Sequence, residues 1–172
     1  NTIATVWTGD QESYTPMEYI ETARAVMGSI DTDPASNELA QKIVKAKTYY
    51  TKEDNGLDKS WEGNIFLNPP YSQPEIKQFI DKMLEELTPD KQAILLTNNN
   101  TDTAWFHAAA QKAAAICFTR GRINFYKADV PKTSPTNGQV FFYFGKNEEQ
   151  FILKFKEIGL ILKTYDYISQ KI

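Results

Sequence analysis

Short apolar runs recur along the chain at the length that buried strands have. A run of about four to eight apolar residues between turn residues is typical of a strand covered on both faces. The run at 93–96 is a clear case, because it is fully apolar and leads into three asparagines. We expect strands over 29–33, 49–51, 65–67, 93–96, 115–119, 121–126, 139–144 and 160–168.

Between these runs the apolar residues fall at three- and four-residue spacing, which predicts helices packed on a sheet. The range 74–87 shows this best, with one apolar stripe and charged residues opposite. Another helix is expected to begin at Pro16, capped by Thr15, and to end at Gly28. We expect helices over 16–27, 36–47, 74–87, from a cap at 101 or 102 to 115, and over 148–157.

The order of these elements predicts an α/β fold. Strands alternate with helices through most of the chain, and an antiparallel pair, 121–126 with 139–144, follows. We therefore expect a doubly wound, mostly parallel sheet with an antiparallel hairpin at one edge. The 172 residues would form one domain, with residues 1–14 as an N-terminal arm and 127–138 as a long polar loop.

Composition limits the class of protein. With 41% hydrophobic residues, no apolar run of membrane-spanning length and no leader-like start, we expect a folded cytoplasmic protein. The sequence opens at Asn1 rather than a methionine, so we expect a trimmed start. One cysteine excludes an internal disulfide, and one cysteine with one histidine argues against a metal site or a Cys–His hydrolase.

Charge bears on nucleic-acid binding. The net charge of −3 is unusual for a protein that contacts phosphates, but basic residues gather locally. Alternatively, such groups are solvated surface, which is the interpretation we favour for the lysines at 42, 45, 47 and 52. The predicted nucleic-acid contacts, next to the long loop or at the end of a strand, are Arg120, Arg122, Lys127, Lys132, Asn98 and Asn99.

The candidate chemistry centres on Asn68-Pro69-Pro70-Tyr71, directly after the apolar run 65–67. Two prolines end the strand and make a rigid turn at its carboxyl end, where open α/β sheets bind ligands. The Asn68 side-chain oxygen and the Pro69 carbonyl are two acceptors that match the two N–H donors of an amino group. The Tyr71 ring can stack on a base, worth about 1–3 kcal/mol. A plain strand-ending turn is the alternative.

Acidic residues at strand ends suggest a ribose-binding site. Asp33, and secondly Asp31, precede a helix in the manner of α/β nucleotide sites. Asp54, before the Asn55–Gly56 turn, can accept from an adenine amine, although a local turn explains it equally well. No G-x-G loop is present, which weakens a dinucleotide or ATP site and leaves open a donor without phosphate.

The tetrapeptide matches the catalytic motif of amino-methyltransferases, and the longer pattern resembles the phage-type DNA N6-adenine methyltransferase family. The resemblance spans roughly 7–145. The matching pieces are Thr15-Pro16, Asp31-Thr32-Asp33-Pro34-Ala35-Ser36-Asn37, Tyr49-Tyr50-Thr51, Asp54-Asn55-Gly56-Leu57, Trp61, Asn68-Pro69-Pro70-Tyr71-Ser72 and Gly121-Arg122-Ile123-Asn124-Phe125.

This resemblance implies a Rossmann-like class I methyltransferase that uses S-adenosylmethionine to methylate adenine N6 in DNA, in the cytoplasm of a bacterial host. It implies catalytic roles for Asn68, Pro69, Pro70 and Tyr71. The cofactor contacts that it implies, of which Thr15 and Pro16 would touch the methionine end, are Thr15, Pro16, Asp31, Asp33, Pro34, Ala35, Ser36, Asp54, Asn55 and Asn68.

Two alternatives keep part of this interpretation. The same tetrapeptide could serve methylation of glutamine N5 in a protein or of an RNA base, and the acidic composition slightly favours a protein target. A DNA-binding module that retains a methyltransferase-like fold without catalysis is the other alternative.

Overall fold

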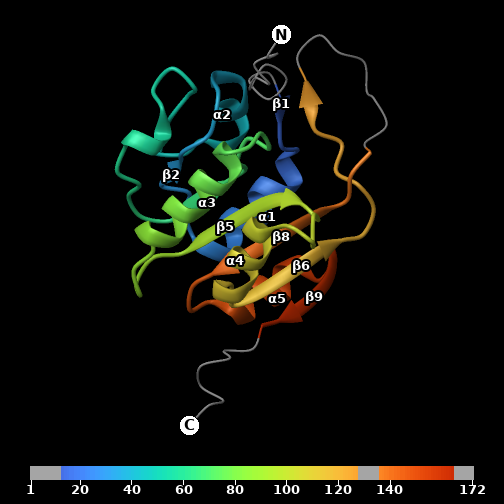
Figure 1. Cartoon of the computed structure of the whole chain (residues 1–172). Coiled ribbons are helices and arrows are strands. Elements are labelled where there is room, and N and C mark those ends of the chain that lie inside the picture. Colours follow the sequence, from blue (N-terminus) through green and yellow to red (C-terminus); the bar gives the residue numbers. More distant parts are fainter. Residues whose placement is uncertain (1–12, 128–135, 165–172) are drawn as a thin grey trace.

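The computed structural model describes residues 13–127 and 136–164, and its centre is a seven-stranded mixed sheet with helices on both faces (Figure 1). The strands of this sheet are β2 (Thr32–Asp33), β3 (Thr48–Tyr49), β4 (Ile65–Leu67), β5 (Ala93–Asn98), β6 (Ala115–Thr119), β8 (Gln139–Phe144) and β9 (Gly159–Lys163). Their order across the sheet is β3-β2-β4-β5-β8-β6-β9. The predicted α/β class is confirmed, and the arrangement is consistent with a Rossmann-like fold.

The sheet has a parallel half and an antiparallel half. Strands β3, β2, β4 and β5 pair in parallel, whereas β8 is antiparallel to both β5 and β6, and β9 is antiparallel to β6. The predicted edge hairpin of 121–126 with 139–144 is therefore wrong. Instead, β8 lies between β5 and β6, and β7 (Tyr126–Lys127) pairs with β1 (Ser13–Tyr14) in a separate two-stranded sheet.

Burial explains this correction. All six residues of β8 are buried, as an interior strand of a covered sheet requires. The segment 121–125 cannot take such a place, because Arg122 and Asn124 are exposed on either side of buried Ile123. A strand next to β8 must be apolar on both faces, and β5 and β6 satisfy that condition better.

The helices cover the two faces of the sheet and enclose two cores. One core lies under α1 (Met17–Met27), α2 (Glu38–Val44) and α5 (Glu148–Phe155), and the other under α3 (Glu75–Glu86) and α4 (Ala104–Lys112). Alternate residues of one strand serve opposite cores: in β4, Phe66 contributes to the first, while Ile65 and Leu67 contribute to the second. This two-sided burial is why the apolar runs are continuous.

Helix ends differ in detail from the prediction. Gly28 ends α1 in the left-handed conformation with φ 85°, as expected. Pro16, rather than Thr15, takes the cap position of α1 and makes no side-chain cap hydrogen bond. Helix α4 begins later than predicted, because Thr103 accepts from the Phe106 N–H at 3.3 Å and caps it.

Within residues 13–127 and 136–164, the helices are too short or too polar to cross a lipid bilayer.

Candidate functional site

The carboxyl ends of the parallel strands lie in a row across the sheet. We call this row the carboxyl edge, which is distinct from the outermost strands β3 and β9. Thr32 of β2 is level with Ile65 of β4, and Leu67 of β4 is level with Leu95 of β5. Asp33, which ends β2, and Asn68, which follows β4, therefore lie on the same edge. Ligands of open α/β sheets bind at this edge.

Asn68 carries an unsatisfied acceptor at that edge. Its Oδ1 is buried and has no hydrogen-bond partner among the residues that the structure describes. Pro69 and Pro70 are buried, and the ring of half-buried Tyr71 packs against the core under α3 and α4. A buried acceptor without a partner costs about 1–3 kcal/mol, so such atoms mark places where a ligand or water donates. Strand β4 ends at Leu67, directly before these residues, as expected.

Asp33 is a buried carboxylate held by its own loop. It is 4% exposed, and its Oδ2 accepts from Gln41 Nε2 at 2.8 Å. The Ser36 hydroxyl and the Ala35 N–H also donate to this carboxylate, but burial outweighs them and raises the pKa of Asp33 to about 7. An ionised carboxylate accepts about four hydrogen bonds, so room is left for about one more donor rather than two ribose hydroxyls.

This burial predicts a pH-dependent stability. Because the folded pKa of about 7 lies above the unfolded one, the Asp33 contribution to stability is full below about pH 4 and is lost as pH rises to about 7. Between pH 5 and 8, we expect the free energy of unfolding of wild type to fall by about 2–3 kcal/mol more than that of Asp33→Asn. Urea unfolding of both proteins across this range measures the difference.

Asp31→Asn is the matched control for that experiment. Burial of Asp31 opposes ionisation, but hydrogen bonds from the Asn64 N–H, Lys47 and Ser29 outweigh it and lower its pKa. The Asp31 contribution is therefore lost only in acid, and its difference from wild type should stay flat between pH 5 and 8. A flat Asp33→Asn difference would contradict the assignment of the raised pKa to Asp33.

Asp31 lies at the amino-terminal ends of the parallel strands, opposite the carboxyl ends where Asn68 lies. Its Oδ2 accepts from the Asn64 N–H at 2.8 Å, and Asn64 directly precedes β4. Lys47 Nζ is 3.2 Å from its Oδ1, and the Ser29 hydroxyl donates to Oδ2 at 3.1 Å. Of the two predicted ribose contacts, the structure brings only Asp33 to the edge that carries Asn68.

The turn at 54–56 packs against the loop that follows β2. A Cβ placed on Gly56 would lie 2.1 Å from the Pro34 carbonyl oxygen, so this approach requires glycine. The predicted contacts Pro34, Ala35 and Ser36 and the Asn55 turn therefore lie together, and Asn55 is left-handed with φ 54°.

Asp54 is occupied by its own turn. Its Oδ2 accepts from the Thr51 N–H at 2.9 Å and from the Thr51 hydroxyl at 3.0 Å, and the residue is exposed. The geometry matches the local-turn alternative for Asp54.

Thr15 and Pro16 join β1 to α1, and both are buried. The ladder between β1 and β7 places Tyr14 opposite Tyr126, and the two rings stack with centroids 5.1 Å apart. Thr15 thus directly follows the strand that pairs with β7.

The candidate nucleic-acid contacts only partly come together. Arg120 and Arg122 are exposed beyond β6, and Lys127 belongs to β7, whereas Lys132 lies outside the described residues. At the end of β5, Asn98 Oδ1 is 3.5 Å from Gln139 Nε2, and the Asn99 N–H donates to the Gly138 carbonyl at 3.0 Å. Sequence reasoning missed Gln139, since a single glutamine at the start of an apolar run carries no signal.

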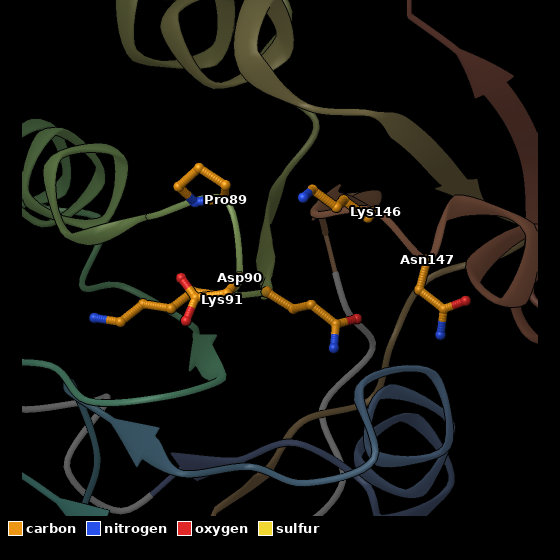
Figure 2. Close-up of a pocket in the computed structure, with 6 residues that line it drawn as sticks. Pro89, Asp90, Lys91, Lys146 and Asn147 are labelled. Atoms are coloured by element: carbon orange, nitrogen blue, oxygen red, sulfur yellow. The ribbon is translucent and has the colours of Figure 1, made fainter.

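A cavity of about 250 Å³ lies at the amino-terminal end of β5, away from Asn68. Figure 2 shows Pro89, Asp90 and Lys91 on one segment and Lys146 and Asn147 on another. It coincides with none of the predicted site residues. Among the described residues, no cluster of three or more His, Cys, Asp or Glu side chains could hold a metal ion.

Comparison with known proteins places the chain in a family. The model of the DNA N-6-adenine-methyltransferase (Dam) family matches residues 5–158. A DNA N-6-adenine-methyltransferase of Escherichia phage T1 is 36% identical over 104 residues, which cover 59% of this chain and 42% of the phage protein. One of Haemophilus phage HP1 is 28% identical over 98 residues, 56% of each chain.

The chain thus spans about half the length of the curated relatives it matches. The family match, in contrast, covers most of this chain, including the Asn68 corner, the Asp33 loop and the segment after β6. The chain therefore belongs to the DNA N-6-adenine-methyltransferase (Dam) family.

Proposed function

We propose that this protein transfers a methyl group from S-adenosylmethionine to N6 of adenine in DNA. The observation that carries the proposal is the buried Oδ1 of Asn68 at the carboxyl end of β4, which has no hydrogen-bond partner within residues 13–127 and 136–164. An acceptor in that position lacks a donor, and an exocyclic amine supplies one. Family membership and the names of the two phage relatives support adenine N6 as the amine.

The corner at Asn68 would activate and orient the amine. The lone pair of an aromatic amine is delocalised into its ring, so the nitrogen is a poor nucleophile. If Asn68 Oδ1 and the Pro69 carbonyl accept hydrogen bonds from its two N–H groups, the nitrogen becomes more tetrahedral and its lone pair points away from the corner. As the methyl group moves from sulfur to nitrogen, the S–CH3 bond breaks, and the nitrogen would then release one of these protons to solvent. Two fixed acceptors thus provide orientation and electrostatic stabilisation without a titrating base.

The cofactor would lie along the same edge. S-adenosylmethionine supplies a methyl group on a positively charged sulfur and has no phosphate, which agrees with the absence of a glycine-rich phosphate loop. Asp33 has capacity for about one hydroxyl of the ribose. Thr15 and Pro16, at the start of α1, would contact the methionine end, and the Pro34–Ser36 loop with the Asn55 turn would enclose the adenosine.

The DNA would have to present its adenine outside the helical stack, because N6 is inaccessible to this corner within a duplex. Tyr71, next to the acceptors, would stack on the extruded base. Exposed Arg120 and Arg122 would contact phosphates, which position the protein on DNA without reading sequence.

Transfer of labelled methyl groups tests the function directly. The protein is incubated with methyl-labelled S-adenosylmethionine and, in separate reactions, duplex DNA, RNA or a protein extract. We expect label in DNA, recovered as N6-methyladenine after digestion. Label in protein alone would assign glutamine N5 instead, and cofactor binding without any transfer would assign a non-catalytic module.

A further inference from the structure

Gln139 is a buried polar side chain at the start of β8, on the edge of the sheet that carries Asn68. It is 4% exposed and pairs with Asn98, the last residue of β5. Its Oε1 accepts from the Ile123 N–H at 2.8 Å, and its Nε2 donates to the Asn137 carbonyl at 2.8 Å. One amide group thus links β8 to the segment between β6 and β7.

The segment held by Gln139 belongs to neither helix nor strand. It runs from Gly121 to Phe125, with Ile123 1% exposed in the core and Arg122 and Asn124 exposed on either side. Because Ile123 is fixed by its side chain in the core and by its N–H at Gln139, the backbone that carries Arg122 has a defined course along the sheet edge.

We propose that Gln139 is a positioning residue for DNA: it fixes residues 121–125 so that Arg122 meets the phosphate backbone while the target base reaches Asn68. This inference rests on the proposed function. Gln139 itself faces the protein interior and contacts neither substrate.

Replacing Gln139 by methionine retains its length and removes its hydrogen bonds to Ile123 and Asn137, together with the longer one to Asn98. The Ile123 N–H and the Asn137 carbonyl then lose their partner, which favours departure of the segment from the edge. DNA binding would then have to order residues 121–125 again, and the free-energy cost of that ordering weakens DNA binding. Asp33, the proposed ribose contact, lies on β2 across the sheet and keeps its hydrogen bond from Gln41, and Pro16 keeps its hydrogen bond from the Tyr19 N–H.

Gln92 provides a matched control. Its Oε1 accepts from the Tyr143 hydroxyl at 2.7 Å, and its Nε2 donates to the Met27 carbonyl at 3.2 Å. It therefore bridges segments as Gln139 does, but it precedes β5 at the opposite end of the same strands. Gln92→Met loses a comparable pair of hydrogen bonds far from residues 121–125.

The experiment measures kcat, the KM for DNA, the KM for S-adenosylmethionine and amide hydrogen exchange in wild type, Gln139→Met and Gln92→Met. For Gln139→Met we expect a KM for DNA about tenfold higher, with kcat and the KM for the cofactor within about twofold, and faster exchange at Ile123. The slope of log affinity for DNA against log salt concentration should become shallower by the amount expected for about one lost phosphate contact. Gln92→Met should leave all of these values unchanged.

Equal increases in the KM for DNA in both variants would overturn the proposal, because a general loss of stability would then explain them. Faster exchange at Ile123 with an unchanged KM would overturn it too, since the segment would then not position DNA. If wild type transfers no methyl group to DNA, the proposed function fails. Fluorescence anisotropy of labelled duplex DNA then still tests Gln139, which is supported by weaker binding in Gln139→Met alone.

Discussion

Asn68→Ala should lower the rate of methyl transfer by about 10²–10³ while leaving S-adenosylmethionine binding nearly intact. The substitution removes Oδ1, the buried acceptor without a partner among the described residues, and leaves the Pro69 carbonyl as the remaining acceptor for the amine. Loss of one such preorganised group typically lowers kcat by about 10²–10³. Single-turnover transfer of labelled methyl groups gives the rate, and equilibrium dialysis gives the affinity for the cofactor.

Asn68→Asp is the informative companion, because it keeps an oxygen acceptor at the same position. It should retain much more activity than Asn68→Ala. An equal loss of cofactor binding and transfer in Asn68→Ala would contradict the role of Asn68, since it would mean that the corner supports the fold or the cofactor rather than the amine.

Of the proposed variants, Trp61→Ala should be the least stable, with a free energy of unfolding, measured with urea, about 3–5 kcal/mol below that of wild type. Trp61 is 0% exposed and stacks on Phe79, with ring centroids 6.1 Å apart. Its Nε1 donates to the Gly56 carbonyl at 2.8 Å, so its removal also releases the turn that packs against Pro34. A large cavity and an unpaired carbonyl would result together.

Trp61→Phe separates these two effects. It keeps an aromatic ring against Phe79 and removes the hydrogen bond to Gly56, so we expect a loss of about 1–2 kcal/mol. Equal losses for the two variants would show that the hydrogen bond, rather than packing, stabilises this region.

Local features of the fold could be predicted from the sequence, whereas strand neighbours could not. The apolar run at 65–67 and the prolines that follow are adjacent in the chain, so the corner at Asn68 follows from backbone chemistry alone. The position of β8 depends on which strands best cover one another, and β5 precedes it by some forty residues, as the pairing of Asn98 with Gln139 shows. Adjacency in the sequence favoured 121–126 as its partner instead.

The same distinction applies to the candidate site. Asp31 and Asp33 differ by two positions, and their roles separate only because Asn64 and Lys47 hold the first at the amino-terminal side. Gln139 acts on the backbone N–H of a residue sixteen positions away, and no side-chain pattern encodes such a contact. The spacing of apolar and polar residues does not predict a hydrogen bond between a side chain and backbone that is distant in the sequence.

The insertion of β8 between β5 and β6 affects how the chain matures. A nascent chain that ends before residue 139 has the parallel strands β2 to β5 on one side and β6 on the other, and the strand that pairs with both β5 and β6 has not yet been synthesised. Strands β5 and β6 both have unpaired edges until β8 is made, and unpaired strand edges can pair with other chains. Assembly of the complete sheet, including the strand end that carries Gln139, is thus a late event in synthesis.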